Sequence, residues 1–182
     1  MIERLNEKMG AIHRDTDKPY MERIATNFTL VGGRTVNAEV LNKASWLGIA
    51  AGLRSMMPIA VLTATSDKSS PTLKKLTTYM AVGEVIGDKL PIIPGRVTKG
   101  PFLARIVIGA LSGAVFSKRL QQPPLAGAMR GALGAALGTI IGYTYRSFAS
   151  SAIGIPDIVW ALAEDGIAYT LAVNAATPEP QA

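Results

Sequence analysis

Glycine recurs at helical spacing through the clearest apolar stretch of the chain, residues 123–147. The steps between successive glycines are four, three, four and four, so all five lie on one helix face. They are Gly127, Gly131, Gly134, Gly138 and Gly142. In water each would cost about 1 kcal/mol relative to alanine. In lipid the same glycines let another helix approach closely, so the pattern predicts a packed membrane helix. We expect its neighbour within the same bundle, with a second copy as the alternative.

The composition of the 182-residue chain also favours a membrane protein. Charged residues make up 18% of it, against roughly 25% in soluble domains, and the mean hydropathy is +0.25. The formal net charge of +6 comes from lysines and arginines spread along the chain rather than gathered on one face. Such cations are typical of the flanks of membrane helices. Nucleic acid is therefore not an expected partner.

The charge pattern divides the chain into three regions. Residues 1–43 are rich in charge and are expected to form a cytoplasmic extension that starts with an amphipathic helix. The apolar residues of that helix are Ile2, Leu5, Met9 and Ile12. Asn37 is expected to cap the helix that follows. Residues 44–175 are expected to form an integral membrane domain, and residues 176–182 a disordered tail.

The membrane domain is predicted to be an all-α polytopic bundle of four to five Gly-rich segments. Residues 44–66 contain one charged residue, Arg54, and can cross about 30 Å of hydrocarbon. Pro58 predicts a kink or break near the middle of this segment. Residues 76–90 are too short to cross comfortably, so we expect a re-entrant segment there. The other predicted segments are residues 101–117 and 155–174.

Six ionisable residues lie within or at the edges of these apolar segments. They are Arg54, Glu84, Asp88, Arg146, Glu164 and Asp165. An unpaired charge at the centre of a membrane helix costs about 2.5–3.5 kcal/mol on insertion scales, so the six cannot all face lipid. We expect Arg54 to pair with Glu84 or Asp88, and Arg146 to pair with Glu164 or Asp165. Such pairs either fix helix register or line a permeation or proton route, and both roles stay open.

A weak internal likeness links two parts of the chain. Residues 48–55 resemble residues 138–147 across a two-residue gap, and an acidic helix is expected after each. Duplicated halves with broken helices are common in transporters, whose sites lie where the halves meet. The likeness therefore indicates an internal duplication or a chance match between Gly-rich stretches.

Three motifs carry a family resemblance. They are Gly52-Leu-Arg54-Ser-Met-Met-Pro58, Glu84-Val-Ile-Gly-Asp88-Lys89-Leu-Pro91 and Ala161-Leu-Ala-Glu164-Asp165-Gly-Ile-Ala. With them the chain resembles the bacterial family catalogued as domain of unknown function four-one-two-six, over about residues 44–175. The Asp-Lys-x-Pro element is the most specific part. The resemblance implies a small multi-pass protein of the cytoplasmic (inner) membrane with no assigned reaction.

The sequence offers little for catalysis or cofactor binding. It has no cysteine, and its one histidine, His13, lies among charged residues near the N-terminus. Disulfides, thiolate metal sites and cysteine nucleophiles are therefore excluded, and we predict no enzyme activity, cofactor or metal. A carboxylate-only cation site built from the acidic helices would need the arginines to lie elsewhere.

Three functions remain. The first is a transporter or channel in which the six ionisable residues line a polar route. The second is a non-catalytic structural or assembly subunit, in a homo-oligomer or a larger membrane complex, that docks through its glycine face. The third is a soluble helical adaptor. The lipid bilayer is the expected partner in the first two, but the positive charges at residues 1–43, 91–105 and 117–122 do not agree on an orientation.

Overall fold

The computed structural model describes residues 27–30, 34–87, 99–152 and 157–177. Over these residues the chain is helical, in agreement with the all-α prediction, apart from one small β-hairpin. The predicted N-terminal amphipathic helix, Asp88, the side chain of Arg146 and the tail beyond residue 177 lie outside the described part. Residues 1–39 and 40–182 form two separate units.

The first unit contains an antiparallel hairpin that was not predicted. Strand β1 (Asn27–Leu30) pairs with β2 (Arg34–Asn37), and Phe28 lies opposite Val36. Aromatic and β-branched residues of this kind favour strands. Asn37 ends β2, and its Oδ1 accepts a hydrogen bond from the N–H of Glu39 at 2.8 Å. The predicted helix cap at Asn37 is thereby confirmed.

Six helices follow within the described chain. They are α3 (Ala38–Leu53), α4 (Met57–Ala64), α5 (Pro71–Gly87), α6 (Lys99–Arg119), α7 (Pro124–Ala152) and α8 (Asp157–Ala176). The segments predicted at residues 101–117, 123–147 and 155–174 correspond to the last three. The segment predicted at residues 76–90 is part of the longer α5, which starts with proline, a residue whose missing N–H needs no partner at that position.

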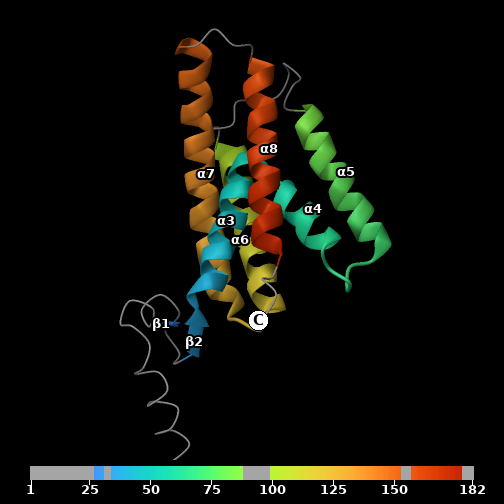
Figure 1. Ribbon diagram of the computed structural model, residues 1–182, viewed down its shortest axis with the longest axis vertical. Helices are drawn as coiled ribbons and strands as arrows, with labels where there is room; N and C mark the ends of the chain where they lie inside the picture. Colours follow the sequence, from blue (N-terminus) through green and yellow to red (C-terminus); the bar gives the residue numbers. More distant parts are fainter. Residues whose placement is uncertain (1–26, 31–33, 88–98, 153–156, 178–182) are drawn as a thin grey trace, which may run out of the picture. The chain divides into compact units, whose positions relative to one another are not determined.

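The path predicted for residues 44–66 is wrong, although the predicted break is confirmed. α3 ends at Leu53, and α4 begins at Met57 with Pro58 in its first turn. Val61 and Leu62 of α4 share a buried cluster with Val40 from the first turn of α3. α4 therefore runs back toward the end where α3 begins (Figure 1). The two helices form a hairpin instead of one continuous segment.

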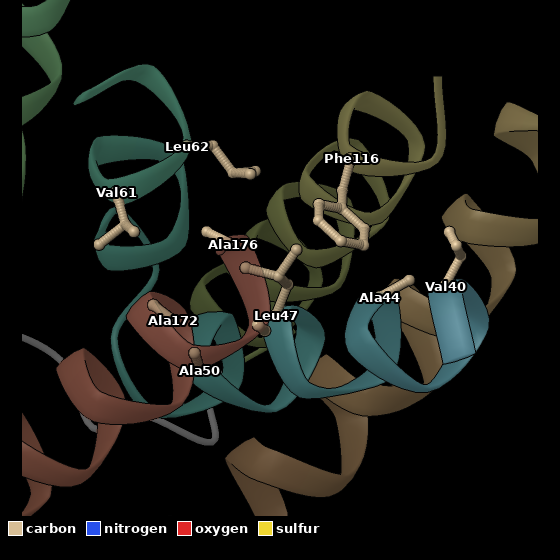
Figure 2. Packing of buried hydrophobic residues seen from close by; sticks show 10 residues of the cluster. Val40, Ala44, Leu47, Ala50, Val61, Leu62, Phe116, Ala172 and Ala176 are labelled. Carbon is tan, nitrogen blue, oxygen red and sulfur yellow. The ribbon is translucent and has the colours of Figure 1, made fainter. Parts of the chain in front are cut away.

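This buried cluster holds the hairpin in the bundle. It contains Val40, Ala44, Leu47 and Ala50 of α3, Val61 and Leu62 of α4, Phe116 of α6, and Ala172, Ala175 and Ala176 of α8. Figure 2 shows these side chains gathered from the four helices. α8 runs antiparallel to α3, since the Lys43 ammonium donates to the carbonyl oxygen of Thr177 at 3.3 Å.

A tight turn joins α6 to α7. Gln121 has a φ of 57°, and the N–H of Gln122 donates to the carbonyl oxygen of Ser117 at 2.9 Å, which closes α6 with a Schellman motif. α3 and α7 begin, and α4, α6 and α8 end, at the same end of the bundle. We call it the basic end. The elements that meet there carry Lys43, Lys68, Lys74, Lys75, Lys118, Arg119 and Arg130.

The directions of the helices do not fit an internal duplication. α5 is antiparallel to α4, since Thr77 bonds Thr63 at 2.7 Å while Glu84 bonds Ser55, so α5 runs parallel to α3. α7 is also parallel to α3, because its successive glycines meet successive turns of α3, whereas α8 is antiparallel to both. The first acidic helix, α5, is therefore parallel to the glycine-bearing α3, whereas the second, α8, is antiparallel to the glycine-bearing α7. A simple duplication would give them the same direction.

Candidate polar site at the α3–α4 break

The glycine face of α7 lies against other helices of the same chain. Gly127 and Gly131 face α6, and Gly134 and Gly138 face α3. At each of these four positions an added Cβ would lie less than 3.0 Å from an atom of the facing helix. At Gly142 it would lie 3.2 Å from Oε1 of Glu164 in α8. The glycine face is thus occupied within the chain, and it sets the position of α3 against α7.

The end of α3 is bound by side chains from two other helices. The Arg105 guanidinium of α6 donates to the carbonyl oxygen of Gly52 at 2.7 Å, and the Thr139 hydroxyl of α7 donates to the same oxygen at 3.2 Å. Arg105 is only 5% exposed. The last carbonyls of a helix have no partner within it and carry partial negative charge, so a cation there stabilises the helix end.

The start of α4 is bound by a carboxylate from α5. Glu84 accepts hydrogen bonds from the backbone N–H groups of Ser55 and Met56, each at 2.7 Å. Met56, the N-cap residue, makes no side-chain cap of its own. The first N–H groups of a helix lack partners and carry partial positive charge, so Glu84 supplies both the acceptor and the matching charge.

Arg54 lies between these two helix ends and is 1% exposed. Its Nε donates to Oδ1 of Asp165 in α8, which forms an ion pair. Glu164, the residue before Asp165, is also buried and lies beside Gly142 of α7. The break is therefore surrounded by charged side chains from α5, α6 and α8.

These contacts contradict the predicted pairing of Arg54 with Glu84. Arg54 forms an ion pair with Asp165 of the last helix, and Glu84 binds backbone N–H groups at the start of α4. The cause is the reversal at the break, which presents unpaired N–H groups to α5 and turns Arg54 toward α8. The alternative pairing with Asp88 lies outside the described residues. The proposed pairing of Arg146 is not placed, because its side chain lies outside the described residues.

Arg105 is the main site residue that the sequence reasoning missed. It was counted among the cations of the 91–105 loop, whereas it lies in α6 and is buried. One signal could have found it: Arg105 precedes Gly109 and Gly113 by four and eight residues, so all three share one helix face. Because both glycines pack closely against α7, that face had to point inward.

The charged groups of the site can act on ions electrostatically. Among the described residues, no group of three or more His, Asp or Glu side chains could hold a metal ion. Glu84 and Asp165, which a carboxylate-only cation site would have used, bind α4 and Arg54. What remains is a set of guanidinium groups, carboxylates and helix ends fixed inside the bundle, which attract or repel ions through their charge.

The outside of the helices is strongly apolar. On α7, large apolar residues recur every four positions, and all are more than half exposed: Leu125, Met129, Leu133, Leu137 and Ile141. Two helical stretches, Gly100–Arg119 and Pro124–Tyr145, are long and apolar enough to cross a membrane. Only 33% and 44% of them is buried, whereas the core helix of a soluble protein is mostly buried. These features indicate membrane association, and the larger number of crossings stays a prediction.

No protein-family model, no curated protein and no solved structure matches this chain. The resemblance described from the motifs around Arg54, Glu84 and Glu164 therefore stays a prediction.

Proposed function

We propose that this chain is a small multi-pass protein of the cytoplasmic membrane with a transporter- or channel-like centre at the α3–α4 break. The distribution of side chains on α7 supports the membrane location. The glycines of α7 are buried, and its large apolar residues point outward. Soluble monomers rarely expose a contiguous apolar surface as long as this face of α7. Lipid-facing helices that associate through small residues show this distribution.

The basic end supports an orientation for the bundle. Few described carboxylates lie near the lysines and arginines of this end. One of them, Asp67, is in the turn between α4 and α5. Membrane proteins keep lysine and arginine in short loops on the cytoplasmic side. We therefore infer that the basic end faces the cytoplasm and that α3 and α4 enter the membrane from that side.

One observation carries the transport proposal: a broken helix whose two ends lie inside the bundle among buried charges. Non-helical backbone at membrane depth is tolerated where it is enclosed by protein or lines a cavity. Transporters use such breaks to present helix ends to ions or substrates near the bilayer midplane. Here the charged side chains of Arg54, Glu84 and Arg105 gather at the break between α3 and α4.

The membrane location is tested by fractionation. We expect the full-length protein to sediment with membranes, to resist extraction by alkaline carbonate and to dissolve in mild detergent. If the protein stays in the supernatant after membranes are pelleted, it is a soluble helical adaptor and the proposal fails.

Transport is tested in proteoliposomes that contain the purified protein. Proton, potassium and chloride fluxes are measured with a pH-sensitive dye and ion-selective electrodes, against empty vesicles. We expect flux of at least one ion above the empty vesicles, a several-fold smaller flux for Glu84→Gln, and an unchanged flux for the exposed control Arg130→Gln. If the folded protein passes none of these ions faster than empty vesicles do, the charges at the break only position the helices and the transport proposal fails.

An assembly subunit would need a different docking face from the one the sequence suggested. The glycine face is occupied by α3 and α6 of the same chain. Purification as a lone monomer in mild detergent would argue against this alternative.

A further inference from the structure

A groove lies between α4, α5 and α6 on the outside of the bundle. Its volume is about 340 Å³, within the range of roughly 300–1,000 Å³ that is common for small-molecule sites. Its α6 wall contains Leu111, Val115 and Arg119, at steps of four along one helix face, together with Ser112. Leu62 of α4 and Leu73 of α5 form the facing walls. The groove is thus apolar along most of its length.

The groove becomes polar and cationic at the basic end. Arg119 ends the α6 wall, two helical turns (about 12 Å) beyond Leu111. Ser69, from the turn between α4 and α5, also lines the groove. Within the described part of the chain, no carboxylate forms an ion pair with Arg119. An apolar groove that ends in such a cation complements an amphiphile with a negative head.

We propose that this groove binds an anionic phospholipid of the cytoplasmic leaflet. The phosphate lies at Arg119 and Ser69, and an acyl chain lies along Leu111 and Val115. Cytoplasmic leaflets carry anionic lipids, and basic pockets between membrane helices on that side bind their head groups. The inference rests on the proposed membrane location and orientation but not on ion passage.

The bound lipid would couple α5 to the rest of the bundle. Among the described hydrogen bonds, α5 is joined to α4 by the Thr63–Thr77 bond and by the Lys74 ammonium, which donates to the carbonyl oxygen of Ala64, and to the break by Glu84. Leu73 of α5 and Val115 of α6 line opposite sides of the groove and are each nearly half exposed. A lipid chain between them fills that gap, so its binding stabilises the folded protein.

The test uses delipidated full-length protein in mild detergent, with lipid binding followed by the thermal midpoint Tm and by native mass spectrometry. The probes are phosphatidylglycerol, phosphatidylcholine with the same acyl chains, and inorganic phosphate. We expect phosphatidylglycerol to bind and to raise Tm more than phosphatidylcholine does. Arg119→Gln should weaken phosphatidylglycerol binding about five-fold, the effect of one basic residue at a membrane surface.

Two further variants separate the parts of the site. Arg130→Gln removes the same charge from an exposed position on α7 and should leave lipid binding unchanged. Val115→Trp keeps Arg119 but fills the groove, so it should also weaken phosphatidylglycerol binding. Equal binding of the two lipids, equal losses in Arg119→Gln and Arg130→Gln, or full stabilisation by inorganic phosphate would each overturn the proposal. None of these readouts depends on ion flux, so the transport proposal succeeds or fails separately.

Discussion

Gly131 is the residue at which three helix backbones meet. A Cβ on Gly131 would lie less than 3.0 Å from the backbone of Gly109 in α6, and a Cβ on Gly48 of α3 would lie equally close to the backbone of Gly131. A flexible side chain could rotate away from such a contact, but backbone cannot. A single methyl group at this position must therefore move whole helices.

Substitution of Gly131 with alanine should lower the stability of the protein by about 1–3 kcal/mol, the usual cost of overpacking a filled interior. The matched control is Gly166→Ala in α8, where no neighbouring atom lies within 4 Å of an added Cβ. There alanine should be neutral or stabilising by up to about 1 kcal/mol, because it favours the helix. Thermal unfolding of both variants in detergent measures the difference. Equal effects would mean that the helices approach less closely than described.

The Arg54–Asp165 pair should appear as strong coupling in a double-mutant cycle. Arg54→Gln and Asp165→Asn each remove this partner from a charge inside the bundle, so each should cost about 3–5 kcal/mol. The double variant should cost clearly less than the sum, since neither charge remains. A second cycle with Arg54→Gln and Glu84→Gln should show weaker coupling, because Glu84 binds backbone N–H groups. Stronger coupling in the second cycle would restore the pairing predicted from the sequence.

At the scale of elements, the break between α3 and α4 is held by side chains of matching charge. Arg105 binds the negative end of α3, and Glu84 binds the positive end of α4. Pro58 makes the break possible because it lies where a missing N–H costs nothing. The short α4 has only eight residues, so its stability depends on these contacts more than on its own length.

Removal of the Glu84 carboxylate should therefore loosen the start of α4. In Glu84→Ala we expect the amide hydrogens of Ser55 and Met56 to exchange faster with solvent, with a loss of about 1–2 kcal/mol in stability. Hydrogen exchange read by mass spectrometry measures the local effect. Asp67→Ala, which removes an exposed carboxylate from the turn after α4, is the control and should leave these amides protected. Unchanged exchange in Glu84→Ala would show that another group holds the helix start.

The positions of the elements were more predictable from the sequence than their partners were. The apolar periodicity located α6, α7 and α8, and Pro58 located the break. The same reasoning paired Arg54 with Glu84 and not with Asp165, because it gave each arginine the acidic helix that follows it in the chain. The direction of α4 decides which acidic helix meets which end of the break, and no local pattern encodes that direction. Arg105 was missed because a cation near an apolar segment was taken to mark its edge.

At the scale of the whole molecule, the hairpin of α3 and α4 changes the topology of the bundle. Residues on either side of residues 44–66 lie at the same end, whereas a single crossing would place them at opposite ends. The groove at Arg119 and the break at Arg54 then differ in depth: one opens at the basic end, and the other lies inside the bundle.

This topology can be tested by labelling single cysteines, since the natural chain has none. Asn42→Cys in α3 and Asp67→Cys after α4 should both react with a membrane-impermeant maleimide from the cytoplasmic side only. Gly100→Cys, at the opposite end of α6, should react from the other side. Labelling is compared in intact spheroplasts and inverted vesicles. If residues 42 and 67 react from opposite sides, the chain crosses the membrane once between them and the hairpin is wrong.

The Arg54–Asp165 contact joins residues 111 positions apart in the chain, and in the proposed membrane location this separation bears on the order of assembly. Translation delivers the guanidinium to the membrane long before the ribosome has made its carboxylate. During that interval the cation lacks this counter-charge, and hydrocarbon is a costly place for a charged group. We therefore expect the hairpin to reach its final position only after synthesis of the last helix, although its own residues are among the first of the bundle to be made.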